Sequence, residues 1–274
     1  VVAFVGLYFL QLPFPLIVFG ALVIGFLGGR WAPAQFGGKQ LETSGSQSAS
    51  NKVSWRSTLR TGLVGIAVWS APILVVGMWL GWDSTVAQLG WFFSKAALVT
   101  FGGAYAVLPY VGQQAVENYG WLSATQMVDG LAFAETTPGP LIMIVQFVGF
   151  VAAWQHSSGF SPLVAATLGA AITTWVTFVP TYLFILLGAP YVERAHDDAR
   201  LKAALSAVTA AVVGVILNLT VWFGMHVLFP DSGGMDGFAL VVGLGAFAAM
   251  LWTKVDMMLV IVFCGTAGFL WSLV

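Results

Sequence analysis

The sequence predicts an all-α polytopic membrane protein, a helical bundle that contains discontinuous or re-entrant helices. Three observations support this fold class. Charged residues make up 8% of the 274 residues, against roughly 25% in an average soluble domain. Hydrophobic residues make up 59% of the chain, and the mean hydropathy is +0.90. Apolar runs of about 20 residues recur, and they lack the alternating polarity of membrane β-strands.

The expected helices are apolar segments separated by polar turns. The first one spans a break at Pro13 and Pro15, and the start of the chain has neither the basic region nor the cleavage site of a signal peptide. We interpret the start as the end of one helix followed by another, within a fragment of a longer protein. The predicted segments are 12–29, 61–81, 86–108, 125–154, 163–187, 203–229, 237–252 and 255–274.

Residues 30–60 form the one stretch that is predicted to be soluble. It is a Ser/Gly/Gln-rich linker that contains GKQLETSGSQSASNK. It carries five basic residues against a single acid, Glu42. By the positive-inside rule, this excess predicts a cytoplasmic linker. The basic residues are Arg30, Lys39, Lys52, Arg56 and Arg60.

The loops after the linker alternate in charge, as the positive-inside rule expects for opposite sides of a membrane. The turn at 82–85 and the loop at 230–236 contain acids and no base, which predicts an outside location. The loop at 188–202 contains three bases, which predicts an inside location. This pattern holds if segments 86–108 and 125–154 both cross the membrane. It holds equally if both are re-entrant hairpins that return to their own side.

Both of these segments contain a backbone break, FGG at 101–103 and TTPGP at 136–140. The apolar pieces 86–101 and 141–154 would make helices of only about 24 Å and 21 Å, short of the ~30 Å hydrocarbon core. Paired, interrupted and short apolar segments are typical of a transporter site built from discontinuous helices. Irregular backbone at membrane depth is tolerated only where it lines a cavity or is covered by protein.

Lys95 is a candidate anion ligand, because it lies in the apolar run WFFSKAALVTFGG. A lysine within a membrane segment costs about 2.5–3.5 kcal/mol and therefore faces protein or water. The alternative is a structural role, in which Lys95 reaches the outer membrane interface about ten residues from the nearest turn.

Glu135 opens the second break, with Asp129 one and a half turns earlier. One interpretation pairs Glu135 structurally with Lys95 or places it at an interface. The other is a desolvated carboxylate that carries a proton. After Glu135, the hydroxyls of Thr136 and Thr137 could cap a helix or donate to a ligand.

The stretch Pro138–Gly139–Pro140 favours an oxyanion site. Proline suits the first turn of a helix, where its missing N–H is no loss. The free N–H groups of Gly139, Leu141 and Ile142 would point at the break, and a helix N-terminus attracts anions. The alternative is a simple kink. We favour the anion site because an acid, two threonines and a second Gly-rich break accompany it.

The remaining sequence excludes several classes of function. The net charge of −1 gives no indication of nucleic-acid binding. We expect no metal or cofactor, because the three histidines lie far apart in sequence. A single cysteine, Cys264, rules out an internal disulfide. Neither a G-x-S-x-G nor a Walker A motif is present, so we expect neither an enzyme nor an ATP-driven pump.

Residues 101–150 read FGGAYAVLPYVGQQAVENYGWLSATQMVDGLAFAETTPGPLIMIVQFVGF. This stretch resembles the signature of the chromate ion transporter family, with its FGG-x-x-A-x-LPY and A-E-T-T-P-G-P elements in order. The segment FLGGRWAP at 26–33 resembles the end of the family's first half. Together with the breaks, the resemblance implies a substrate site. Its residues would be Lys95, Phe101, Gly102, Gly103, Tyr105, Glu135, Thr136, Thr137, Pro138, Gly139 and Pro140.

Long members of this family have two homologous halves in opposite orientations. The resemblance therefore implies one half of an inverted-repeat transporter. Residues 1–29 would end the first half, 30–60 would be the linker, and 61–274 would be the second membrane domain.

The resemblance also implies export of chromate, a tetrahedral dianion, driven by the proton gradient and conferring chromate resistance. The alternative is uptake of sulfate or a related oxyanion. The expected location is the bacterial inner membrane. The expected partners are the dianion, the lipid bilayer and the missing N-terminal half, and a homodimer is one assembly to consider.

Overall fold

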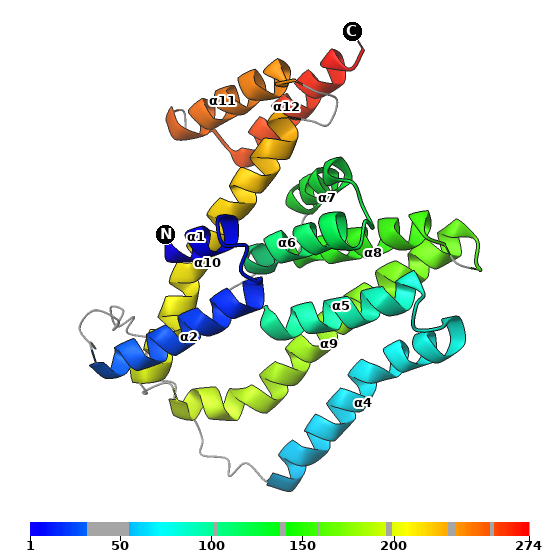
Figure 1. Cartoon of the computed structure of the whole chain (residues 1–274), viewed down its shortest axis with the longest axis vertical. Coiled ribbons are helices and arrows are strands. Elements are labelled where there is room, and N and C mark those ends of the chain that lie inside the picture. The colour runs from blue at the N-terminus through cyan, green and yellow to red at the C-terminus, as the bar shows by residue number, and fades with distance from the viewer. Residues whose placement is uncertain are drawn as a thin grey trace.

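The computed structural model describes residues 1–31, 55–100, 104–137, 141–157, 159–195, 199–229, 234–252 and 255–273. These ranges are built from helices, with no strand among them, which confirms the predicted all-α class (Figure 1). The elements, in chain order, are α1 Val2–Tyr8, α2 Phe14–Trp31, α4 Trp55–Leu80, α5 Thr85–Val99, α6 Ala104–Gln113, the π-helix η1 Gln114–Asn118, α7 Ala124–Thr136, the 3-10 helix η2 Leu141–Met143, α8 Ile144–Gln155, α9 Pro162–Ala195, α10 Ala199–Leu228, α11 Gly237–Trp252 and α12 Met257–Trp271.

Four helices of the described chain are long and apolar enough to cross a membrane. They are α2, α4, the Pro162–Gly188 part of α9 and the Arg200–Leu228 part of α10. Only 11% of the apolar window of α4 is buried inside the protein. A helix that is apolar on its exposed faces needs lipid around it, so the fold is that of a polytopic membrane protein.

Segment 86–108 folds back on itself at its Gly-rich break. Phe92 on α5 and Tyr110 on α6 lie nine residues on either side of position 101. Their ring centroids are 5.5 Å apart, and those of Phe92 and Trp121 are 5.7 Å apart. A continuous helix would separate Phe92 and Trp121 by about 40 Å at 1.5 Å per residue. The two arms that flank the FGG motif in sequence therefore form a hairpin (Figure 1).

Segment 125–154 folds back in the same way at its proline-rich break. Phe133 on α7 and Phe147 on α8 have ring centroids 6.1 Å apart, and Phe147 also fills the space beside Gly130. The outer ends of the two hairpins meet, since the Thr85 hydroxyl donates to the His156 carbonyl at 3.4 Å. Of the two alternatives left open by the charge pattern, the folding back at both breaks favours the one in which both segments are re-entrant hairpins.

The hairpins are packed into a core that is completed by α9 and α10. The face of α5 that bears Leu89, Phe92 and Phe93 is fully buried. Helix α8 crosses α9 at Gly149 and Gly169, where an added Cβ would collide with the facing helix. Close approach at small residues is a common way for membrane helices to associate. The long helices thus hold both hairpins in fixed positions.

Helix α2 belongs to this core as well. Its Gly25 lies against Ala203, Ala204 and Ala207 of α10, where a Cβ would come within 2.5–2.7 Å of α10 atoms. Phe14 at the start of α2 stacks on Tyr110 of α6, with ring centroids 6.1 Å apart. The segment expected to end the first half therefore packs directly on the second.

Both ends of the expected linker are helical. Helix α2 continues through Arg30 to Trp31, and α4 starts at Trp55. Only the middle of the 30–60 stretch, residues 32–54, lies outside the described residues.

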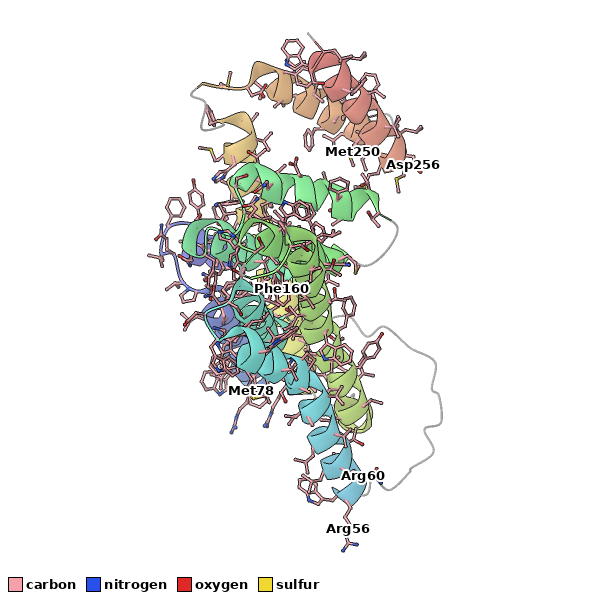
Figure 2. The ribbon with its side chains drawn as sticks, turned by 90° about the vertical axis from the view of Figure 1, so that its right-hand side faces the viewer. Arg56, Arg60, Met78, Phe160, Met250 and Asp256 are labelled. Atoms are coloured by element: carbon pink, nitrogen blue, oxygen red, sulfur yellow. The ribbon has the colours of Figure 1, made fainter. Side chains whose placement is uncertain are left out.

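The C-terminal helices α11 and α12 pack mainly on each other and on the end of α10. They have 16 and 15 residues and no buried residue. Figure 2 shows Met250 and Asp256 of this pair at the opposite end of the molecule from Arg56 on α4.

Candidate functional site

The tip of the first hairpin lies between Thr100 and Ala104. Helix α5 ends where the Thr100 hydroxyl donates to the Ala96 carbonyl at 2.6 Å. Helix α6 starts at Ala104 and contains Tyr105 in its first turn. The predicted site residues Phe101, Gly102 and Gly103 lie outside the described residues.

The second tip is entered through Thr136 and Thr137. The Thr136 hydroxyl donates to the Ala132 carbonyl at 2.9 Å, and the Thr137 hydroxyl donates to the Phe133 carbonyl at 2.6 Å. Thr137 has extended backbone with ψ 123° and ends α7. The expectation that these threonines cap the next helix is wrong. Their hydroxyls bond back to carbonyls of α7, and the Phe133 carbonyl accepts the Thr137 backbone N–H as well, at 3.0 Å.

The arm that returns from the second tip starts at Leu141. It makes one 3-10 turn, η2, before α8 begins at Ile144. Its N-cap Met143 provides no side-chain hydrogen bond. A helix start of this kind leaves backbone N–H groups free to bind an anion. The predicted residues Pro138, Gly139 and Pro140, just before this turn, lie outside the described residues.

The two returning arms meet. Residues of η2 contact α6, so the first turn after the proline-rich motif lies against the helix that follows the FGG motif. Both helices begin within a few residues of their motifs. The N-terminal end of a helix carries partial positive charge, which attracts anions.

A cavity of about 330 Å³ opens between the arms of the second hairpin. Its walls are mostly apolar, and its two polar side chains are those of Thr137 and Gln146. The half-buried Gln146 amide has no hydrogen-bond partner among the described residues. In contrast, the hydroxyls of most threonines in the described helices donate to a backbone carbonyl of the same helix. Gln146 is the single polar side chain between Leu141 and Trp154, which could have marked it as a candidate ligand. The sequence analysis did not include it in the site.

Glu135 is half-buried on α7, beside the residues that line this cavity. The lining comes from Gly130, Phe133, Ala134 and Thr137, which share one helix face. Glu135 and the exposed Thr136 lie on the adjacent face. The structure therefore brings Thr137, but not Glu135, into the cavity wall.

Lys95 lies on the exposed face of α5, away from that cavity. Its Nζ is 5.6 Å from the centroid of the Trp91 ring one turn earlier, a cation–π geometry. Trp91 is itself 58% exposed. The pair is accessible from outside the protein, and the sequence did not predict the role of Trp91.

Glu117 lies in the π-helix η1, where the first hairpin returns to its outer end. Its side chain is exposed. In addition, its Oε1 accepts a hydrogen bond from Trp222 Nε1 of α10 at 3.1 Å. Trp222 packs on His226, with ring centroids 4.2 Å apart. This contact ties the end of the hairpin to a membrane-length helix.

Within the described ranges, no group of three or more His, Cys, Asp or Glu side chains is placed to hold a metal ion. Among the described groups near the second break, the Gln146 amide can donate to an anion, while the Thr136 and Thr137 hydroxyls already donate to carbonyls and the Glu135 carboxyl lies beside them.

Comparison with known proteins places this geometry in context. Residues 87–269 match the family model described as chromate transporter. A chromate transport protein of Cupriavidus metallidurans is 35% identical over 136 residues, which cover 50% of this chain and 31% of that protein. A chromate transport protein of Pseudomonas aeruginosa is 33% identical over 213 residues, which cover 75% of this chain and 46% of that protein.

An uncharacterized transporter of Bacillus subtilis is 26% identical, over 59% of this chain and 71% of that protein. The chain thus spans less than half the length of the two curated chromate transport proteins. No solved structure matches it.

Proposed function

Because this chain belongs to the chromate transporter family, we propose that it forms one half of a membrane transporter that exports chromate by secondary active transport. The proton gradient supplies the driving force, and the result is chromate resistance of the cell. The protein lies in the bacterial inner membrane with residues 30–60 on the cytoplasmic side. An N-terminal half of the same protein completes the transport path.

The observation that carries this proposal is the contact between the two arms that follow the breaks. The returning arms α6 and η2 begin directly after the FGG and Pro-Gly-Pro motifs and contact each other. A tetrahedral dianion that leaves water needs its hydration replaced by hydrogen-bond donors. Backbone N–H groups and helix dipoles supply these without burying a second full positive charge, which membrane insertion would penalise.

Side chains around the tips add to the binding of the anion. The Gln146 amide has donors to spare and lines the cavity together with Thr137. Lys95 gives fixed positive charge on the accessible face of α5 and attracts the dianion toward the path. The proposed substrate site also includes Phe101, Gly102, Gly103, Tyr105, Pro138, Gly139 and Pro140.

Glu135 provides the coupling to protons. When its carboxylate is ionised, it repels a dianion at the neighbouring tip, and when it is protonated the repulsion ends. A bound dianion therefore favours protonation of Glu135. Binding of the anion and protonation of Glu135 would then be linked at the site.

The test compares cells that express the full-length protein with matched cells that lack it, using radiolabelled chromate and, separately, sulfate. Export predicts lower chromate accumulation in expressing cells, and a proton uncoupler should abolish the difference. The Gln146→Leu variant should lose most of the effect while reaching the membrane in normal amounts. Higher accumulation of sulfate or chromate in expressing cells would instead support uptake and contradict the export proposal.

A further inference from the structure

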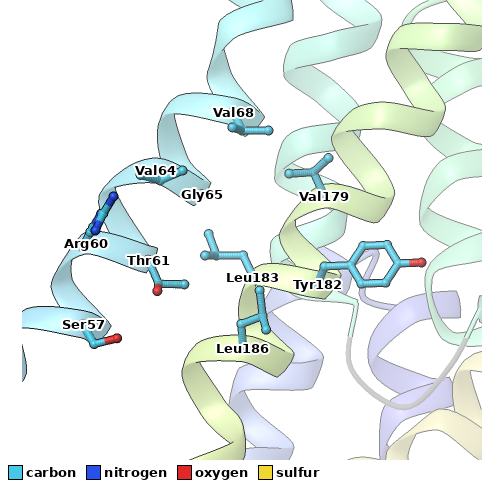
Figure 3. A pocket seen from close by; sticks show the side chains of 10 residues that line it. All are labelled: Ser57, Arg60, Thr61, Val64, Gly65, Val68, Val179, Tyr182, Leu183 and Leu186. Atoms are coloured by element: carbon cyan, nitrogen blue, oxygen red, sulfur yellow. The ribbon is translucent and has the colours of Figure 1, made fainter. Parts of the chain in front are cut away.

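A second concave site lies between α4 and α9, far from the hairpin tips. It is a groove of about 520 Å³. One end has polar residues of α4, Ser57, Arg60 and Thr61, and its length is walled by aliphatic side chains such as Val64 and Leu186 (Figure 3). None of the described residues that line it is acidic. We infer that this groove binds one anionic phospholipid, with the headgroup at Arg60 and an acyl chain between the helices.

The groove runs along the exposed seam between α4 and α9, which also contact each other within this stretch. Leu183 packs into the space left by the missing side chain of Gly65. Farther along, the Trp175 Nε1–H donates to the Val68 carbonyl at 3.0 Å and joins the two helices. Between Arg60 and Val68 the helix rises about 12 Å. That length accommodates the upper part of an acyl chain below a headgroup.

The polar end of the groove suits a phosphate group. Arg60 is exposed, and the hydroxyls of Ser57 and Thr61 make no hydrogen bond with any described residue. Most other helical threonines, such as Thr173 and Thr177, donate to the carbonyl four residues earlier. Figure 3 shows Ser57 and Thr61 projecting from α4 toward α9, with Arg60 beside them on the same helix. A guanidinium and two hydroxyls can all donate to phosphate oxygens.

The position of the groove suits a lipid rather than a soluble anion. Arg56 and Arg60 mark the far end of α4 (Figure 2), a helix long and apolar enough to span the membrane. An arginine at the end of such a helix reaches the level of the lipid headgroups. Val64 is 55% exposed and Leu186 is 65% exposed, so the walls offer an apolar surface where acyl chains are already present.

The experiment uses the purified full-length protein in detergent. Phosphatidylglycerol and phosphatidylcholine with identical acyl chains are added in equal amounts, and bound lipid is counted by native mass spectrometry. The wild type should prefer phosphatidylglycerol. The Arg60→Gln variant should lower this preference about fivefold, as expected for one arginine near an anionic headgroup. Arg30→Gln is the matched control, because Arg30 is also exposed near the end of a membrane-length helix but does not line the groove.

A second variant, Val64→Trp, fills the groove and should lower retention of both lipids. Arg60→Gln changes only an exposed side chain. It therefore tests the contact between Arg60 and the lipid headgroup even if the Val64→Trp variant does not fold. Equal loss of preference in the Arg60 and Arg30 variants would overturn the site, as would a wild type with no preference. A wild-type dimer that dissociates on Val64→Trp would show that a second copy fills the groove, which also overturns the inference.

Discussion

The rings of Phe92 and Tyr110 lie 5.5 Å apart on opposite arms of one hairpin, with the FGG motif midway between them in sequence. Phe133 and Phe147 have the same relationship across the second break, at 6.1 Å. The segments that flank the two family motifs therefore fold back as two hairpins.

The first prediction concerns Lys95 and the aromatic ring beneath it. If Lys95 supplies charge to the substrate path, Lys95→Gln should abolish chromate resistance at normal membrane expression, and Lys95→Arg should keep part of it. The control variant is Trp91→Leu, which removes the cation–π contact but keeps the charge. It should keep most of the resistance. Full resistance in Lys95→Gln would refute the role.

The second prediction concerns proton coupling at Glu135. In the wild type, chromate affinity should fall as pH rises, because an ionised carboxylate repels the dianion. The affinity of Glu135→Gln for chromate should lack the part of the pH dependence that comes from the carboxylate. The measurement is chromate binding to both proteins in parallel, because the ratio of the two affinities removes the titration of chromate itself. A ratio that stays constant across pH would contradict the coupling.

The third prediction tests the crossing of α8 and α9. A side chain at Gly149 would collide with Thr173, so Gly149→Leu should destabilise the protein by about 1–3 kcal/mol, as overpacking of a core does. Thermal unfolding in detergent measures the change. Gly243→Ala on α11 is the control, because nothing lies within 4 Å of its added Cβ. An unchanged transition for Gly149→Leu would mean that the helices are not in contact at this point.

The fourth prediction tests the contact between Glu117 and Trp222. Removing a hydrogen bond of this kind costs about 0.5–1.5 kcal/mol. The variants Glu117→Ala and Trp222→Phe should therefore each destabilise the protein, and the double variant should be less destabilised than their sum. Trp154→Phe is the control variant, because it removes an exposed indole elsewhere in the protein and shows how much stability that loss alone changes. Strict additivity of the two changes would show that the hydrogen bond adds no stability.

Much of the fold could be predicted from the sequence. The length of an apolar run and the position of Gly and Pro residues determine locally where a helix runs and where it ends. Both breaks were predicted, and α5 and α7 end beside them. The direction of the chain after each break was not predictable. If segments 86–108 and 125–154 both cross the membrane, or if both are re-entrant, the charged loops at 82–85, 188–202 and 230–236 lie on the same sides. The charges of these loops therefore cannot distinguish the two topologies. The separation comes from pairs distant in sequence, such as Phe92 with Trp121.

The site was predicted less completely, for a related reason. Whether a threonine at a break caps the next helix or closes the previous one depends on the backbone after it. Thr137 is extended, and its hydroxyl bonds back to Phe133. The cavity role of Gln146 needed the opposite arm to be in place. Sequence periodicity shows which residues share one helix, and it does not show which residues two helices enclose.

The central claim is that both signature segments re-enter on one side. Single cysteines at the exposed positions Asp83, Asn118, Gln155 and Lys202, in a Cys264→Ser background, can be labelled with a membrane-impermeant maleimide on intact cells and on inverted vesicles. The structure predicts that the first three react from one side and Lys202→Cys from the other. Reaction of Asn118→Cys from the same side as Lys202→Cys, and opposite to Asp83→Cys and Gln155→Cys, would show that both segments cross and would contradict the account.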